Sequence, residues 1–407
     1  MKKAINSKSK QFNNCPLEEA LQFPLIEALL GRRSRRFAFG AEITSGPLTF
    51  KSSHAPLPLD DLEQMLVLLA AGGRTFPSAA GFHTVELFFT DDSGTYFLPT
   101  RDAPAVFENI NVQNFNLEEL IDAHRKRVQK VQDGRLVIPR SFPHMEGHNF
   151  WIANNPGTTL VIPVADVAQH FIANLCYFLQ SGYVIYDDYN KRQVPGIERF
   201  AHRVDLKNPY PLSYVEQMTL MESTVEISTS CYSGALMLQA LGLGGWMYNG
   251  IDRHAVFGIS GDSAAPGLGF EYVTDERWTL PNPTRLPGVF EAMCPPNYPD
   301  MRSAVEAFAK RKFGPGGPFH SETPGIWNDT GKVRSSVQVH DDEFKECVML
   351  QAQYVYDTFG KIPATSPSLL CVMYLQAHHL DLDFYDHHFK PGAYLDTHAR
   401  HMEQWHR

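Results

Sequence analysis

The sequence has few cysteines, and none of them forms a CxxC pair. The six cysteines are spread widely through the chain, so their spacing gives no disulfide framework. A reducing compartment is the simpler interpretation of such cysteine usage. The basic N-terminal residues are not followed by an apolar segment, which argues against a signal peptide. We therefore expect a cytoplasmic protein.

Long uninterrupted hydrophobic runs are also missing. The most apolar stretch, residues 158–186, contains Asp166, His170 and Gln180. Polar residues at these positions favour a buried strand followed by a helix over a membrane span. We expect no membrane partner.

Positive charge is scarce as well. Lysine and arginine number 36 against 45 aspartates and glutamates, which gives a formal net charge of -9. Bulk electrostatic affinity for nucleic acid is not expected at this charge. The chain also lacks a GxGxxG turn, a phosphate-binding P-loop, an HExxH pair and a GxSxG elbow. Any redox cofactor is therefore held without a recognisable Rossmann turn.

The hydrophobic pattern that is present predicts a mixture of helices and strands. It indicates helices over about 17–31, 60–73 and 212–241, each with glycine at or just after its end. Residues 83–90 alternate and are rich in β-formers, and a turn at 91–94 leads to a partner strand. A strand over 158–164 precedes another helix. The chain from residue 340 onward returns to helical patterning.

Three short motifs, in order along the chain, bear on function. The arginine run, RRSRR at residues 32–36, places four guanidiniums in five residues, and arginine offers planar, bidentate donors suited to phosphate. PSAAG at 77–81 has small residues that let a backbone approach a flat ligand. ALGLGGW at 240–246 ends a long helix. Singly, each has an ordinary alternative: a solvated basic turn, a helix-to-strand connection and a glycine C-cap.

Together and in this order, the motifs resemble the nitroreductase superfamily. The form PSAAGFHTVELFF is more similar to its azoline dehydrogenase branch than to simple nitroreductases. The resemblance extends over roughly residues 20–260. It implies an α+β fold with an antiparallel-rich sheet flanked by helices, a homodimer, and FMN as cofactor. The residues that it implies for FMN binding are Arg32, Arg33, Ser34, Arg36, Pro77, Ser78, Ala79, Gly244 and Gly245, with Arg35 pointing elsewhere.

Two features of the family pattern are not matched clearly. Gly81 replaces the usual asparagine after Pro-Ser-Ala-x. The family's late basic residue for the phosphate has only Arg285 and the 310–312 run as loose candidates. The dehydrogenase branch uses a lysine and a tyrosine near the middle of the chain. The candidates here are Tyr186, Tyr189 and Lys191, with exposed loop residues as the alternative.

The resemblance implies an FMN-dependent oxidoreductase that transfers hydride through flavin N5. Its substrate would be a small molecule or derived from a peptide, with NAD(P)H or oxygen as the second redox partner. The alternatives are another flavin enzyme of the same fold, a non-catalytic flavin- or partner-binding protein, and a metal-dependent enzyme. The expected organisation is an FMN-binding domain over 1–260 with an insertion at about 100–156. An irregular Pro/Gly-rich segment over 261–338 and a helical C-terminal extension over 339–407 follow it.

The metal-dependent alternative depends on histidines near the C-terminus. His398 and His401 lie on one helical face, in a region that also contains Asp381, Asp383, Asp386, His387 and His388. Imidazoles and carboxylates are sound ligands for zinc or iron. A metal site needs three or four convergent ligands, however, and the sequence places only one helical pair together. We expect these helices to be structural and to bind no metal.

Overall fold

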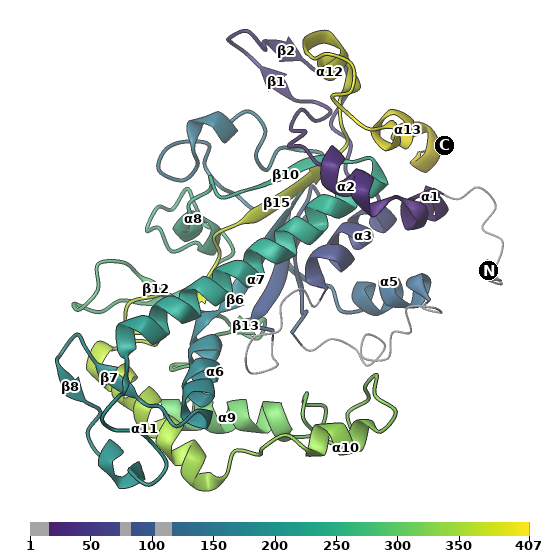
Figure 1. Ribbon diagram of the computed structural model, residues 1–407. Helices are drawn as coiled ribbons and strands as arrows, with labels where there is room; N and C mark the ends of the chain where they lie inside the picture. Colours follow the sequence, from purple (N-terminus) through teal and green to yellow (C-terminus); the bar gives the residue numbers. More distant parts are fainter. Residues whose placement is uncertain (1–15, 74–82, 102–115, 407) are drawn as a thin grey trace.

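A seven-stranded antiparallel sheet forms the centre of the computed structural model, which describes residues 16–73, 83–101 and 116–406. The strand order is β10-β15-β6-β3-β4-β5, and β14 also pairs with β6. These strands are β3 (Val85–Thr90), β4 (Gly94–Leu98), β5 (Gln129–Asp133), β6 (Thr158–Asp166), β10 (Gly244–Tyr248), β14 (Leu369–Leu370) and β15 (Tyr374–His378). Helices flank the sheet, so the fold is α+β, as expected (Figure 1).

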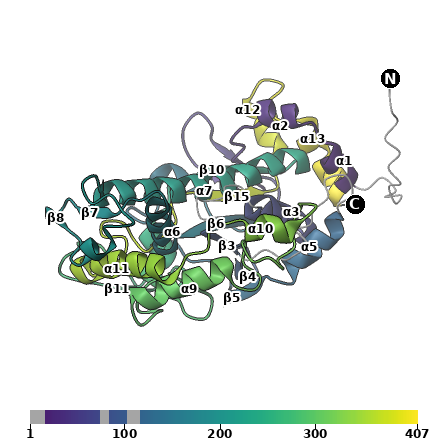
Figure 2. The same ribbon diagram turned by 60° about the horizontal axis from the view of Figure 1, so that its bottom comes forward.

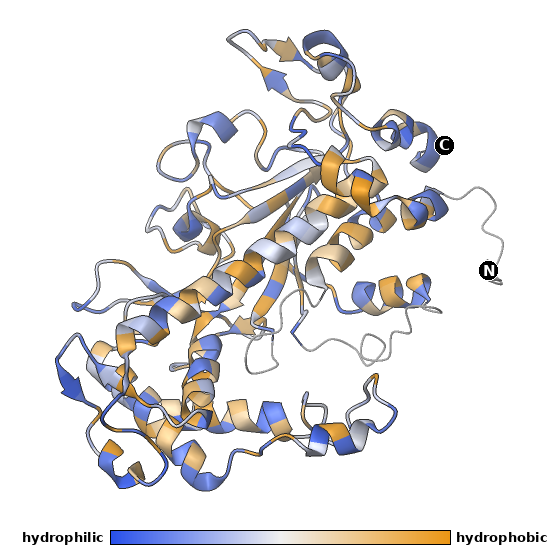
Figure 3. Cartoon of the chain, in the orientation of Figure 1, coloured by the Kyte–Doolittle hydropathy of each residue, from blue (hydrophilic) through white to orange (hydrophobic). Residues whose placement is uncertain are grey.

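Both faces of the sheet are covered, which places a core on each side. Every residue of β3 and β6 is buried. Alternation along β3 sends Leu87 and Phe89 into one core and Phe88 into the other. The first core contains α3 (Asp61–Gly72) and most of α7 (Leu212–Leu241). The second contains α6 (Val167–Gln180), α9 (Met301–Phe313) and α11 (Asp342–Phe359). The strands are accordingly rich in hydrophobic residues (Figure 3).

The remaining elements are short. The N-terminal helices are α1 (Pro16–Gln22) and α2 (Leu25–Gly31), and the C-terminal helices are α12 (Leu382–His388) and α13 (Asp396–Trp405). The others are β1 (Glu42–Ile43), β2 (Phe50–Lys51), α5 (Leu117–Arg125), η1 (Gly147–Asn149), β7 (Ile185–Asp187), β8 (Arg192–Gln193), η2 (Ile197–Phe200), β9 (Tyr210–Pro211), α8 (Arg253–Phe257), β11 (Glu271–Val273), β12 (Asn282–Leu286), β13 (Phe290–Glu291) and α10 (Thr330–Ser335).

Local signals predicted several elements correctly. Asp60 caps α3, and its backbone N–H donates to Glu63 Oε2 at 2.7 Å in a capping box. Helix α7 has the predicted bounds, and β3 and β4 form the predicted hairpin. The single helix expected over 17–31 is instead two helices. Pro24 lacks a backbone N–H and stands at the break.

The C-terminal region, expected to be a helical extension, also contains two strands of the central sheet. Helices α11, α12 and α13 do form, but β14 and β15 join the central sheet, with β15 between β10 and β6. All five residues of β15 are buried. A strand that is buried on both faces shows no alternation, so its sequence pattern does not distinguish it from a buried helix. The segment expected to be irregular also contains the regular helix α9.

The two ends of the molecule hold different elements. Figures 1 and 2 agree that α1, α2, α12 and α13 gather at one end, whereas β7 and β8 lie at the other. Helix α7 runs between the two ends (Figure 1). In the part of the chain that the structure describes, no helix is both long enough and apolar enough to cross a membrane.

Candidate functional site

The arginine run is fixed in place by backbone pairing with the edge of the sheet. Arg35 N donates to Gly245 O at 3.2 Å, and Gly245 N donates to Arg35 O at 2.8 Å. Two residues further along, Phe37 O accepts from Asp381 N at 3.0 Å. The run is therefore held between β10 and the segment that follows β15. In such an extended segment, successive side chains point to opposite sides.

Arg35 points into the protein. Its guanidinium donates to Gln239 Oε1 on α7 at 2.7 Å. It also donates to the carbonyl oxygens of Ala393 and Gly31, each at 3.0 Å. Burial lowers the pKa of Arg35 to about 10, so the side chain is still cationic at neutral pH. Its acceptors are uncharged, and its role is to tie the arginine run to α7.

Arg36 lies on the opposite side, between two tryptophan rings. Its guanidinium carbon is 5.3 Å from the ring centre of Trp151 and 4.8 Å from that of Trp246. Nη2 donates to His148 O at 2.9 Å and to Asn149 Oδ1 at 2.8 Å. Nε is buried and has no hydrogen-bond partner among the described residues. Burial lowers the pKa of Arg36. No carboxylate in the described chain compensates this charge.

A cavity of about 550 Å³ opens beside the run, and we call it the arginine-run cavity. Its wall combines the side chains of Arg33, Arg36 and Lys390 with aromatic and apolar side chains. No aspartate or glutamate occurs among its described lining residues. These are Arg33, Ser34, Arg35, Arg36, Phe37, Ile43, Leu48, Trp151, Phe384, Tyr385, Phe389, Lys390, Pro391, Gly392 and Ala393. The cavity suits a ligand that is both anionic and aromatic.

The structure brings some of the predicted FMN residues to this cavity. Arg33, Ser34 and Arg36 line it. Arg32 does not, because its guanidinium lies 5.5 Å from the ring centre of Tyr232 on α7. The predicted residues Pro77, Ser78 and Ala79 lie outside the described residues.

Gly244 and Gly245 support the arginine run from behind and do not line its cavity. A Cβ atom on Gly245 would lie 2.0 Å from Gln376 O on β15, and the φ angle of Gly245 is +148°. A Cβ on Gly244 would lie 2.8 Å from His378 Nε2. Glycine is thus required here because β10 and β15 pack closely. That requirement arises within the protein and needs no ligand.

Lys390 was missed from the sequence and supplies a late cation to the cavity. Neither Arg285 nor the 310–312 run lines it. Arg285 is paired with Glu271 at 2.6 Å, and Lys312 is buried against the rings of Phe313 and Phe319. The turn Lys390-Pro391-Gly392 after α12 was the only local signal. A turn alone does not indicate what its lysine faces.

Tyr186, Tyr189 and Lys191 lie at the other end of α7. Tyr189 donates its hydroxyl to Glu216 Oε2 at 3.0 Å, in the first turns of that helix. Burial and Glu216 raise the pKa of Tyr189 to about 12. Glu216 and Gln239, the partner of Arg35, are 23 residues apart on one helix, or about 35 Å. A single chain therefore does not bring these three candidates to the arginine-run cavity.

The C-terminal histidines gather differently from the sequence-based expectation. His387 is exposed, and His398 joins no group of potential metal ligands in the described chain. His401 instead meets Glu63, His379 and His406, and their four ligand atoms all lie within 4.8 Å of one another. The sequence offered no signal that would bring Glu63, far away on α3, to this place.

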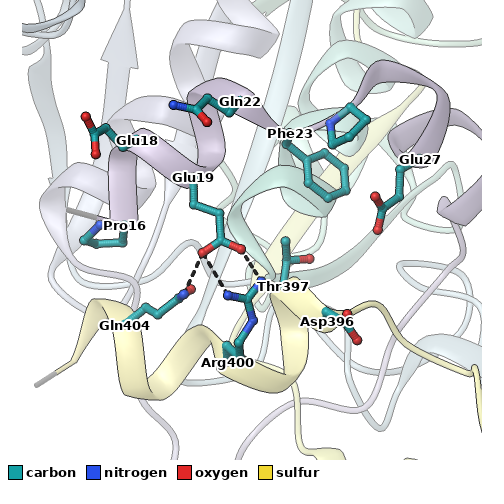
Figure 4. Close-up of a pocket in the computed structure, with 11 residues that line it drawn as sticks. Pro16, Glu18, Glu19, Gln22, Phe23, Glu27, Asp396, Thr397, Arg400 and Gln404 are labelled. Atoms are coloured by element: carbon teal, nitrogen blue, oxygen red, sulfur yellow. Dashed lines mark hydrogen bonds and ion pairs between the residues drawn. The ribbon is translucent and has the colours of Figure 1, made fainter. Parts of the chain in front are cut away.

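A second cavity, of about 560 Å³, lies between the N-terminal helices and α13 (Figure 4). Its charged lining residues are Glu18, Glu19, Glu27, Asp396 and Arg400. Arg400 and Gln404 reach across to Glu19, with Gln404 Nε2 at 2.6 Å from Glu19 Oε2. The excess of carboxylates does not suit a phosphate. These contacts instead join α1 to α13.

Comparison with known proteins gives little further guidance. No family model matches the sequence, and no curated protein matches it. Among solved structures, the chain is similar to a protein from Ralstonia eutropha JMP134 that is provisionally described as a nitroreductase. The match covers 61% of this chain and 76% of that one, with 14% sequence identity and a TM-score of 0.28. So distant a likeness supports no functional conclusion.

Proposed function

We propose that this protein is an FMN-dependent oxidoreductase whose cofactor phosphate binds in the arginine-run cavity. One observation carries the proposal: the cavity is lined by positive charges and aromatic rings, and by no carboxylate among the described residues. Arg33, Arg36 and Lys390 supply the charge, while Trp151 and Phe384 are among the rings. A volume of about 550 Å³ is within the usual range for small-molecule sites. FMN is anionic at one end and aromatic at the other, and the order of the sequence motifs also favours it.

The side chains present fit a phosphate group. Arg36 is largely buried, yet it has only neutral acceptors and an unpartnered Nε. Burying such a cation is costly unless an anion accompanies it. Arg33 and Lys390 form no ion pair within the described residues, so both are available to a ligand. The Ser34 hydroxyl can add a hydrogen bond. Charge-assisted bonds of this kind are the strong ones.

FMN, when bound, supplies the hydride-transfer chemistry, and the chain supplies binding and orientation. Phe37 stacks on Phe384 with ring centres 4.1 Å apart and on Trp151 at 5.9 Å, which makes a firm apolar wall that excludes water. Tyr385 accepts a hydrogen bond from Phe37 N at 3.3 Å. Burial raises the pKa of Tyr385 to about 12. Its hydroxyl keeps its proton at neutral pH and can donate a hydrogen bond to a ligand in the cavity.

We infer further that two copies of the chain associate through α2 and α7. Leu25, Ile26 and Leu30 on α2 are 65%, 67% and 80% exposed, directly before the arginine run. Met221 and Val225 add exposed apolar side chains at helical spacing on α7, which packs against α2. Several large apolar side chains exposed on neighbouring helices are typical of an interaction site. A two-fold contact would cover the same surface on both copies.

The visible spectrum of the purified protein tests the cofactor proposal. We expect flavin absorption bands and the release of FMN on denaturation, identified by chromatography. Reduction of the bound flavin by NAD(P)H or by a substrate would separate an enzyme from a flavin-binding protein without activity. A colourless protein that cannot be reconstituted with FMN would contradict the proposal.

A further inference from the structure

Four potential metal ligands converge where His401 of α13 meets Glu63 of α3. Glu63 lies on α3, His379 follows β15, His401 lies on α13 and His406 directly follows it. Glu63 Oε1 is 3.3 Å from His379 Nε2 and 2.9 Å from the Nε2 atoms of both His401 and His406. The Nε2 atoms of His379 and His406 are 3.1 Å apart. Glu63, His379 and His401 are buried, and His406 is partly buried. Three imidazoles and a carboxylate thus point at one small volume.

In two of these histidines, His379 and His401, a backbone contact at Nδ1 leaves Nε2 as the nitrogen that faces the centre of the cluster. His379 Nδ1 lies 2.8 Å from Leu57 O, and His401 Nδ1 lies 2.7 Å from Leu241 O. A carbonyl oxygen can only accept, so each Nδ1 carries the proton. In the neutral rings, both Nε2 atoms then present lone pairs to the centre. This arrangement is the one that holds a metal-binding histidine in its ligating tautomer.

The two lone pairs face a carboxylate that is itself an acceptor. Glu63 Oε2 already accepts from Asp60 N at 2.7 Å, while Oε1 points to the imidazoles. His401 Nε2 is buried and makes no hydrogen bond, although Glu63 Oε1 is only 2.9 Å away. Acceptors at such distances repel one another unless a cation lies between them. The cluster therefore requires either extra protons or a metal ion.

We propose that Glu63, His379, His401 and His406 bind one divalent transition-metal ion, with zinc as the best-suited metal. Ligands at about 2.0–2.1 Å in a tetrahedron are separated from one another by roughly 3.3 Å. Four of the six separations between the ligand atoms are 2.9–3.3 Å, close to that value, and all six are within 4.8 Å. Imidazole nitrogens with one carboxylate suit zinc and its neighbours in the first transition row, whereas magnesium and calcium prefer oxygen ligands.

The site has the remaining features of a structural metal centre. Four protein ligands complete a tetrahedron, and the backbone groups of Leu57, Leu241 and Asp60 orient three of them. A cavity of about 220 Å³ is lined by His401 and Met402 and offers a route of entry. The ion would fasten α13 to α3 and to the end of β15. This metal site is separate from the proposed flavin chemistry and does not depend on it.

Metal binding by the purified full-length chain tests the proposal. After dialysis against a chelator and removal of the chelator, titration with Zn²⁺ in a calorimeter should show one tight site per chain. Co²⁺ should give the visible absorption of a tetrahedral complex. Zn²⁺ should also raise the thermal midpoint of unfolding, because an ion that binds only the folded state stabilises it.

Two ligand variants and one matched control separate this site from adventitious binding. His406→Gln removes a partly exposed ligand, and Glu63→Gln keeps the shape and the hydrogen bond from Asp60. Each should weaken Zn²⁺ binding by about a hundredfold or more, since loss of a mere supporting contact costs about 10–100-fold. His387→Gln changes an exposed histidine on α12 and should bind as the unaltered chain does.

The proposal is overturned if the chain does not bind one Zn²⁺ ion per chain. That result would mean that protons, and not a metal ion, hold the cluster together. It is also overturned if the two ligand variants bind Zn²⁺ as tightly as His387→Gln. Circular dichroism of each apoprotein shows whether the variant is folded, and Glu63→Gln provides the answer if His406→Gln is not. Flavin content does not enter these measurements, so failure here leaves the FMN proposal untouched.

Discussion

Arg35 and Gly245 exchange both of their backbone hydrogen bonds, although they come from opposite halves of the chain. This pairing attaches the arginine run to β10 and sends Arg35 and Arg36 to opposite sides. Arg35 enters the fold, and Arg36 lies beside the arginine-run cavity. A run that looks like one basic patch in the sequence therefore has a structural part and a ligand-facing part.

The ligand-facing part predicts selective effects on FMN affinity. Arg33→Ala and Lys390→Ala should each weaken FMN by roughly ten- to a hundredfold, because a charge-assisted hydrogen bond contributes about 1.5–3 kcal/mol. Riboflavin lacks the phosphate, so its affinity should barely change. The measurement is a fluorescence titration of apoprotein with both ligands. Arg32→Ala is the matched control, since Arg32 lies over Tyr232 and outside the cavity. Equal losses for FMN and riboflavin would argue against the phosphate site.

The structural part predicts a different outcome for Arg35. Arg35→Ala should lower the free energy of unfolding by about 2–4 kcal/mol, because it leaves the buried Gln239 and two partly buried carbonyls without their donor. Urea denaturation followed by circular dichroism measures this change. Arg33→Ala, in the same run but exposed, should change stability by less than about 0.5 kcal/mol. If both variants were equally stable, Arg35 would not have the anchoring role given to it.

A charge introduced on the exposed apolar side of α2 should weaken association of two copies of the chain. Leu30→Lys should shift the chain from dimer toward monomer, since a lysine at an apolar interface must lose its hydration. Size-exclusion chromatography with light scattering gives the mass directly. Val339→Lys replaces an exposed apolar residue on a different part of the surface and should leave the mass unchanged. A monomeric unaltered chain would refute the dimer without affecting the FMN proposal.

The buried His340 should make the free energy of unfolding decrease in acid. Burial lowers its pKa to about 3, with Lys312 adding to the shift, against about 6.5 in the unfolded chain. The fold therefore favours the neutral ring. The contribution of neutral His340 to the free energy of unfolding is present above about pH 6.5. It is lost as the pH falls toward 3, because the His340 side chain is protonated more readily in the unfolded chain than in the folded one. At pH 5 the loss is about 1–2 kcal/mol.

The test of this prediction is the slope of stability against pH. His340→Leu cannot take up a proton, so its free energy of unfolding should fall less steeply between pH 6.5 and 4 than that of the unaltered chain. His387→Leu, at an exposed position, should leave the slope unchanged. Parallel curves for His340→Leu and the unaltered chain would show that His340 does not contribute.

Local sequence signals predicted many of the elements and drew attention to the arginine run, but they did not predict which distant segments would meet to build the sites. Caps and glycines placed α3 and α7, because these signals act within a few residues. The position of β15 was missed, because its burial on both faces removes alternation. Lys390 and Glu63 were missed for another reason. Each meets its neighbours only through tertiary packing between segments far apart in the chain, and helical spacing said nothing of which histidine in α13 would face α3.

The place of β15 between β10 and β6 has a consequence for the order of assembly. Without residues 374–378, β10 has no neighbouring strand within the sheet. The arginine run, which pairs with β10, then loses its fixed backbone partner. The segment that carries Lys390 follows β15 closely. During synthesis, the ligand cavity therefore cannot take shape until β15 and the segment that carries Lys390 have left the ribosome. A chain interrupted before β15 would lack β15, α12, α13 and Lys390, and it should lose its capacity to capture a cofactor.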